Sequence, residues 1–127
     1  MPAIITNAGL AILASRIKGT SNEPVYFAWG TGAGVAAAGD TALFTEASEA
    51  RVAMVSSLET VSVLNDSYKL TGAMTADGTK TITNWGIFDA ASEGNLLLHE
   101  SQDPGDDYTV GQIGAFTFRI QFIRPSA

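Results

Sequence analysis

The sequence contains no cysteine, few charged residues and no long apolar run, and each absence excludes a class of protein. Without cysteine, the chain has no disulfide, no thiol nucleophile and no thiolate metal site. No stretch approaches the roughly 18 apolar residues that cross a bilayer, and the start MPAIITNAGLAILASRIKG lacks the basic n-region of a signal peptide. We therefore expect a soluble protein, made in the cytoplasm, without a membrane partner.

Basic residues are also scarce. The net charge is −6, and the seven Lys and Arg residues are scattered from Arg16 to Arg124. Binding to a nucleic acid backbone needs clustered cations, so we expect no nucleic acid partner. The charged fraction is only 16%, which favours a chain that covers part of its surface with other subunits and forms a homo-oligomer.

The N-terminal part of the chain predicts one helix over residues 6–18. Thr6 or Asn7 can cap its first turn, and Gly19 can end it in the left-handed conformation. Apolar residues at helical spacing form a stripe that we expect to pack on a sheet. The stripe consists of Leu10, Leu13 and Ile17.

The rest of the chain predicts short strands separated by turns. The strand segments are 24–29, 50–58, 67–76, 79–90, 95–101 and 114–124. Asp77-Gly78 lies between two of them and predicts a β-hairpin. Residues 30–41 predict a loop because they are rich in glycine and alanine and lack apolar periodicity, and residues 101–107 predict another because they contain a Pro-Gly turn and three carboxylates. In the last segment, four apolar residues alternate with polar ones and predict a half-buried strand. These four are Phe116, Phe118, Ile120 and Phe122.

This pattern predicts a mainly β protein, an antiparallel β-sandwich or jelly-roll-like barrel with one N-terminal helix. We expect a single domain over residues 1–127, with a sheet region over 25–124 and a mobile arm at 1–5.

The glycine-rich stretch after the first strand resembles a phosphate-binding loop. GAGVAA (32–37) matches G-x-G-x-x-A, and GVAAAGDT (34–41) is similar to a Walker A loop. However, Asp40 occupies the position of the Walker lysine, and a carboxylate there repels phosphate. Gly39-Asp40 also interrupts the helix that dinucleotide binding needs. We therefore expect a turn or mobile loop and no nucleotide cofactor.

Other catalytic or metal-binding patterns are equally weak. His99 is the single histidine, and we expect a partly exposed strand residue rather than a zinc ligand. Asp103, Asp106 and Asp107 lack the spacing of a calcium loop and predict a solvated turn. No serine lies in a G-x-S-x-G motif. The sequence thus predicts no enzyme, no cofactor and no metal.

Two Trp-Gly pairs leave two interpretations open. Trp29-Gly30 and Trp85-Gly86 each interrupt an apolar strand. They fit core tryptophans beside bulges, or an exposed pair at a subunit contact, where tryptophan is enriched.

The order of the short motifs along the chain resembles a family. ITNAGLAIL comes first, followed by WGTG, GDTAL with EARV, WGIFDA, GNLLLHES and the alternating last strand. This order is similar to small virion proteins of tailed bacteriophages and to the N-terminal attachment modules of phage tail fibres. In those modules a helix carrying TNAGL opens the module and GLFD marks a late strand. Here Trp85 precedes GIFD, where such modules often carry an acidic residue.

The resemblance implies a structural role in the virion without catalysis. We expect a trimeric capsid decoration (cement) protein that binds the major capsid protein, because negative charge suits an outward face. The alternatives are a tail, baseplate or tail-fibre attachment component, and a small carbohydrate- or ligand-binding β domain that uses exposed aromatic residues. The candidate subunit-contact residues are Pro2, Ile4, Trp29, Gly30, Gly32, Gly34 and Trp85.

Overall fold

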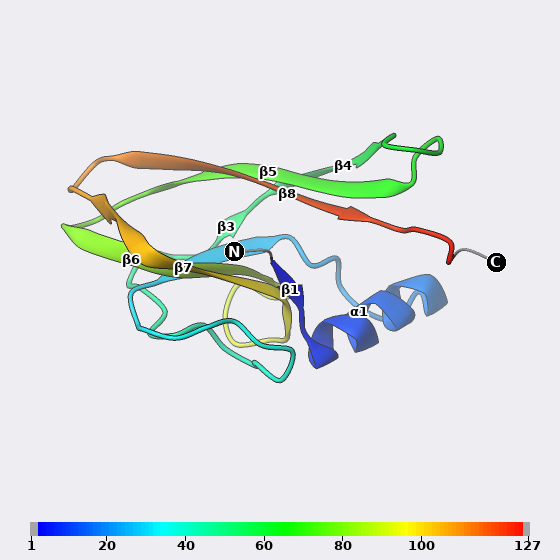
Figure 1. Ribbon diagram of the computed structural model, residues 1–127, viewed down its shortest axis with the longest axis horizontal. Helices are drawn as coiled ribbons and strands as arrows, with labels where there is room; N and C mark the ends of the chain where they lie inside the picture. The colour runs from blue at the N-terminus through cyan, green and yellow to red at the C-terminus, as the bar shows by residue number, and fades with distance from the viewer. Residues whose placement is uncertain (1–2, 126–127) are drawn as a thin grey trace.

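The computed structural model describes residues 3–125 and consists of two antiparallel sheets packed face to face (Figure 1). Sheet A has the strand order β1-β7-β6-β2-β3, and sheet B has the order β4-β5-β8. The strands are β1 (Ile4–Ile5), β2 (Tyr26–Gly30), β3 (Val52–Ala53), β4 (Val55–Glu59), β5 (Ser67–Thr75), β6 (Lys80–Phe88), β7 (Leu96–Tyr108) and β8 (Ile113–Gln121). The predicted β-sandwich with one N-terminal helix is confirmed.

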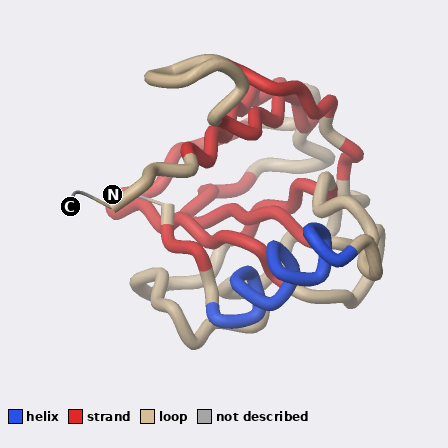
Figure 2. The backbone as a smooth tube through the Cα atoms, turned by 90° about the vertical axis from the view of Figure 1, so that its right-hand side faces the viewer, coloured by secondary structure: helices blue, strands red, loops and turns tan. Residues whose placement is uncertain are grey.

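The helix α1 (Asn7–Lys18) has the predicted ends. The Thr6 hydroxyl accepts a hydrogen bond from the Gly9 N–H at 2.9 Å, and Gly19 ends the helix at φ 84°. Such a side-chain cap satisfies an N–H group that has no partner inside the helix. Figure 2 shows the helix on the side of sheet A that faces away from sheet B.

Only Leu13 of the predicted stripe packs against the core. Leu10 is 60% exposed and Ile17 is 90% exposed, whereas Gly9 and Ile12 are buried. Gly9 lies so close to the carbonyl group of Leu97 that a Cβ atom would not fit. The helix therefore approaches the sheet through its smallest residue, and Leu10 and Ile17 of the stripe stay at the surface.

The hairpin predicted at Asp77-Gly78 is wrong, because β5 and β6 belong to different sheets. All nine residues of β5 pair with β8, from Ser67 opposite Gln121 to Thr75 opposite Ile113. The turn therefore carries the chain from sheet B to sheet A. Its local chemistry was recognised correctly, but the partner of β5 comes from a distant part of the sequence.

The predicted strand 50–58 is divided at Met54, where the chain passes from sheet A to sheet B. The Met54 N–H donates to the Val25 carbonyl at 2.8 Å, and its side chain is buried. The crossing thus satisfies the backbone and fills the core.

The loop predicted over 101–107 is also wrong, because β7 continues through it to Tyr108. The register shifts within this stretch, so that the extra residues form a bulge opposite Thr83. Turn-forming residues are tolerated here because a bulge relaxes the geometry of the strand. The pairs that flank the bulge are Ile82 with Asp106 and Asn84 with Ser101.

The core lies between the sheets, and a second apolar cluster lies on the outer face of sheet A. The alternation of the last strand places Phe116 and Phe118 in the core between the sheets, against Phe27 of β2. Phe122 follows β8 and is exposed. The outer cluster consists of Ala28, Leu43, Phe88 and Leu96. Sheet A is therefore covered on both faces.

Within residues 3–125, no helix has the length and apolar character needed to cross a bilayer.

Candidate functional site

The structure describes six of the seven predicted contact residues. Pro2 lies outside the described residues. Ile4 belongs to β1, where it pairs with His99 of β7 at the edge of sheet A. Of the arm predicted over residues 1–5, Ile4 and Ile5 are thus joined to a sheet. The remaining five residues lie in or next to β2 and β6.

Trp29 and Trp85 lie directly opposite each other on β2 and β6, and both are buried. Their rings contact Phe116 of sheet B, with centroid distances of 6.1 and 5.5 Å. This arrangement confirms the interpretation as core residues. Within this chain, the two side chains therefore form no exposed aromatic platform.

Glu49 fixes the polar edge of Trp29. Its carboxylate accepts a hydrogen bond from the indole Nε1 at 2.9 Å and forms an ion pair with Lys80 Nζ at 2.5 Å. The Asp77 N–H also donates to it at 3.0 Å. Burial raises the pKa of Glu49, but these donors outweigh burial and hold the pKa below its usual value. Glu49 therefore connects the C-terminal end of β2 to the turn between β5 and β6.

The glycines after Trp29 pack against Phe44 and Thr45 of the same chain. The Gly32 N–H donates to the Phe44 carbonyl at 2.8 Å, and a Cβ atom on Gly32 would lie 2.8 Å from the Phe44 carbonyl carbon. On Gly34 it would lie 2.6 Å from the Phe44 ring. Gly30 is similarly enclosed. In this structure, the glycines serve close packing within the chain.

His99 is fully buried, in contrast to the partly exposed residue that we expected. Its Nδ1 lies 2.7 Å from Asp40 Oδ2, and its Nε2 lies 2.9 Å from Asn84 Oδ1. The Asn84 amide is held in turn by Phe44, since its Oδ1 accepts the Phe44 N–H and its Nδ2 donates to the Phe44 carbonyl, each at 3.0 Å. We call Asp40, Phe44, Asn84 and His99 the loop network.

The loop network closes the segment 36–44 over sheet A. Asp40 also accepts the Ala37 N–H at 2.8 Å, and Ser101 accepts the Ala36 N–H at 2.9 Å. Ser101, His99 and Asp40 are residue types of a catalytic triad, but the serine and histidine are buried. This placement holds the loop and gives no access to a substrate. Within residues 3–125, no three His, Asp or Glu side chains are grouped to hold a metal ion.

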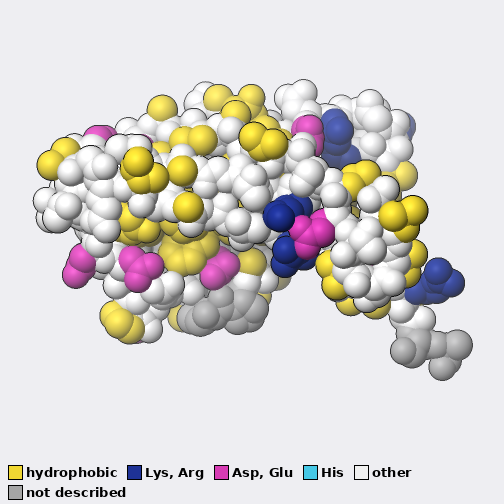
Figure 3. Space-filling view, turned by 90° about the horizontal axis from the view of Figure 1, so that it is seen from above, with side chains coloured by type: hydrophobic (Ala, Val, Ile, Leu, Met, Phe, Trp, Pro, Cys, Tyr) yellow, Lys and Arg dark blue, Asp and Glu magenta, His cyan; other side chains and the backbone are white. Residues whose placement is uncertain are grey.

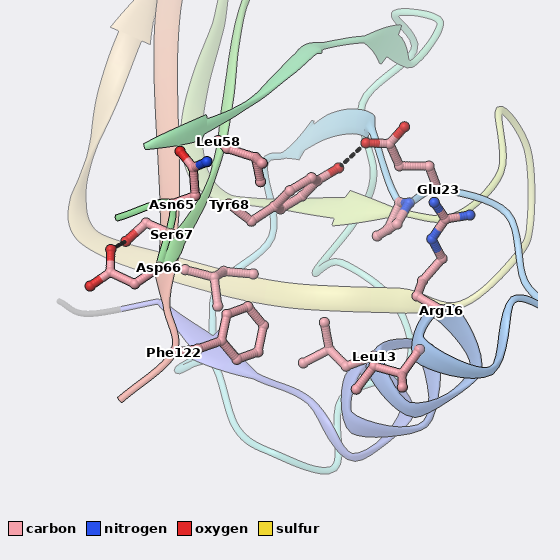
Figure 4. A pocket seen from close by; sticks show the side chains of 12 residues that line it. Leu13, Arg16, Glu23, Leu58, Asn65, Asp66, Ser67, Tyr68 and Phe122 are labelled. Carbon is pink, nitrogen blue, oxygen red and sulfur yellow. Dashed lines mark hydrogen bonds between the residues drawn. The ribbon is translucent and has the colours of Figure 1, made fainter. Parts of the chain in front are cut away.

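α1 projects past the end of sheet A, below sheet B (Figure 1). Residues of α1 and sheet B line a groove there (Figure 4). Its volume is about 340 Å³. The apolar part of the lining comes from elements far apart in the sequence and consists of Leu13, Ile17, Pro24, Leu58, Ile120 and Phe122. We call it the end groove.

The polar groups in the end groove are bonded within the chain. The Tyr68 hydroxyl donates to Glu23 Oε2 at 2.7 Å (Figure 4). Hydrogen bonds from Ser56 and Tyr68 lower the pKa of Glu23. The pKa of Tyr68 is raised, mainly by burial and secondly by its hydrogen bond to the Glu23 carboxylate. The Asp66 carboxylate accepts three backbone N–H groups of residues 61–63. The groove therefore offers an occupant mainly apolar contact.

The sequence contained part of the signal for this groove. The helical spacing predicts that the stripe of α1 packs on the sheet, and the alternation of apolar and polar residues extends to Phe122. Figure 3 shows hydrophobic side chains around the lobe at the right-hand end of the molecule. The sequence does not predict that α1 and the ends of β4 and β8 line one groove. This arrangement depends on how far α1 projects beyond sheet A.

Comparison with known proteins identifies one family. The model of the podophage GP4 fiber I protein gp80 family matches residues 3–121, which include α1 and all eight strands. The chain belongs to this family. It is therefore a bacteriophage structural protein with a place in the virion. No curated protein and no solved structure matches the chain.

Proposed function

We propose that the chain is a non-enzymatic, tail-fibre-related component of a phage virion. The observation that carries this proposal is the match of a fibre-protein family over residues 3–121. The match spans both sheets and α1, so it concerns the whole described fold rather than one motif. The buried positions of His99 and Ser101 agree with a role without catalysis.

The family description favours the tail-fibre alternative over the capsid decoration protein that we expected from the sequence. A trimeric state and binding to the major capsid protein stay hypotheses. The carbohydrate-binding alternative rests on Tyr26, Trp29, Trp85 and Tyr108, and it loses the two tryptophans, since both are buried.

The position in the particle tests the proposal. Antibody labelling of purified virions, followed by electron microscopy, is expected to mark the tail. Quantitative mass spectrometry of the same particles is expected to give few copies of this chain relative to the major capsid protein. Labelling spread over the head, together with a copy number close to that of the shell subunit, would support capsid decoration instead.

A further inference from the structure

We propose that the free edge of β8 pairs with an extended segment of another virion protein, which adds a fourth strand to sheet B. This inference concerns an interaction surface that the family match does not assign, and it does not depend on a location in the tail. It rests on the main-chain groups of β8, on the groove beside them and on one carboxylate in that groove.

The main-chain groups on one side of β8 point away from the sheet. Sheet B ends at β8, which pairs with β5 alone within residues 3–125. Beyond the two ends of this pairing, the Phe122 N–H donates to the Asp66 carbonyl at 2.9 Å, and the Ala76 N–H donates to residue 112 at 2.9 Å. In an antiparallel pair, residues bonded to the partner strand alternate with residues whose N–H and C=O groups point away from it. The residues of β8 that point away from β5 are Ile113, Ala115, Thr117, Arg119 and Gln121.

The other sheet edges are shorter or interrupted. β1 and β3 have two residues each, and β4 has five. β7 extends beyond β1, but it carries Pro104, three aspartates and the bulge opposite Thr83. Short strands, proline, charges and bulges are the usual means by which proteins block an exposed edge. β8 has nine residues with no proline and no register shift, so its edge is open to a further strand.

A groove of about 260 Å³ lies beside this edge and is lined from both sheets. We call it the edge groove. Its rim consists of residues 117–120 of β8. Its floor consists of Ala3, Ile5, Leu98 and Glu100. Ile5 and Leu98 pack against the core between the sheets. Sheet A, with five strands, thus continues past the edge where sheet B, with three strands, ends.

The floor of the edge groove limits what can pair with β8. A strand that joins β8 lies over β1 and β7, where sheet B has no strand of its own. The β8 strand of a second folded copy does not fit there, because its inner face is already covered by its own sheet A. An extended segment outside a packed sheet meets no such obstacle, and strand addition is a general mode of recognition for such segments. The occupant is therefore an extended peptide segment of about five residues or more, the usual length of a strand.

The edge groove also specifies the side chains of this segment. They alternate between the groove and solvent, and those that enter the groove meet Ile5 and Leu98, so apolar residues fit there. Glu100 pairs with no Lys or Arg of residues 3–125. Arg119, the cation that lines the groove, pairs with Glu59 at 2.6 Å. The segment that fits has apolar residues at alternate positions and a basic residue beside Glu100.

Hydrogen exchange in the isolated chain, resolved by residue with NMR, tests whether the edge is free. The Thr117 and Arg119 amides point away from β5 and are expected to exchange fast. The Phe118 and Ile120 amides bond to β5 and are expected to exchange at least about tenfold more slowly. Equal protection of all four amides in the monomer would overturn the proposal, because the edge would then be covered.

Photo-crosslinking in the assembled virion identifies the occupant. A photoreactive amino acid placed at Thr117 is expected to join this chain to a different virion protein, and mass spectrometry of the product locates the segment. Val55 is the matched control site, because it lies on β4 at the opposite edge of sheet B and is 70% exposed. The proposal fails if Thr117 gives no product, gives only a second copy of this chain, or gives the same product as Val55.

Two variants test the contact without a label. Thr117→Pro removes an N–H that points away from β5, so the chain should keep its melting temperature. Copies retained per virion should fall at least about fivefold, because proline blocks the added strand. Glu100→Gln leaves the main chain intact and should lower retention about twofold. A folded T117P variant that is retained like wild type overturns the proposal. If T117P unfolds, unchanged retention of E100Q overturns it instead.

Discussion

The outer face of sheet A and the end groove are two apolar surfaces of the same chain, of which the first is buried and the second is exposed. The outer face of sheet A is covered by the segment that contains Leu43 and Phe44, and its polar groups are joined in the loop network. At the end groove, Ile17 and Phe122 stay exposed beside α1. One surface is closed by its own chain, and the other is open.

The difference lies in the residues that permit close approach. Gly32 and Gly34 let the loop backbone lie against Phe44, and His99 with Asn84 offers buried polar partners to Asp40 and to the Phe44 backbone. Around the end groove, the helix presents bulky side chains and the polar groups are used locally. Small residues and polar anchors let the chain close one surface, whereas bulky apolar side chains without anchors stay exposed at the other.

The largest expected effect is the loss of the loop network. His99→Leu keeps the apolar volume of the ring but removes both polar contacts, which leaves the Asn84 and Asp40 oxygens without this partner. Loss of buried partners costs about 1–3 kcal/mol per group, so we expect the free energy of unfolding to fall by about 2–4 kcal/mol. Urea unfolding measures it, with Val35→Ser as the control in the same loop. A change below about 0.5 kcal/mol would show that the network does not close the loop.

A glycine pair in the loop gives a smaller and more specific test. Gly32→Ala would place a Cβ atom 2.8 Å from the Phe44 carbonyl carbon, whereas a Cβ on Gly39 meets nothing within 4 Å. Overpacking costs typically about 1–3 kcal/mol, so G32A should lower the melting temperature and G39A should leave it nearly unchanged or raise it slightly. Equal effects of the two substitutions would mean that close packing on Phe44 is not what the loop requires.

The same contrast explains how far the sequence predicts this fold. The ends of α1 and the alternation of Phe116 and Phe118 were correct, because caps and strand faces depend on neighbouring residues. The Asp77-Gly78 hairpin failed because β5 finds its partner in β8.

The environment of His99 was missed for a related reason. Its partners Asp40 and Asn84 are brought together only by the loop that covers sheet A. Likewise, the exposure of Ile17 follows from the close approach of Gly9, another residue of the same helix, to Leu97. Each of these features depends on contacts between elements, which local sequence patterns do not contain.

Acid provides a test on the open side of the molecule. Hydrogen bonds from the Val61 and Val63 N–H groups lower the pKa of Asp66 far below 3.8. Partial desolvation opposes this shift, and the Ser62 N–H adds to it. Because the pKa is lower in the folded state, the carboxylate stabilises the fold at any pH above its pKa in the unfolded chain. This stability is lost as the pH falls towards the pKa in the folded state. The stability difference between wild type and Asp66→Asn should therefore be full at neutral pH and shrink as the pH falls below 3.8. A difference that does not change with pH in acid would contradict the role of the carboxylate.

The smallest expected effect is at Ile17, and it is the most informative for the comparison. If the end groove is open to a partner, Ile17 contributes little to the folded monomer, because its side chain is 90% exposed. Ile17→Ser should then change the free energy of unfolding by no more than about 0.5 kcal/mol at a concentration where the chain is monomeric. The variant Ile12→Ser, in the buried face of the same helix, is the control and should destabilise strongly. A large loss in I17S would mean that the stripe packs within the chain, and the two surfaces would then no longer differ in kind.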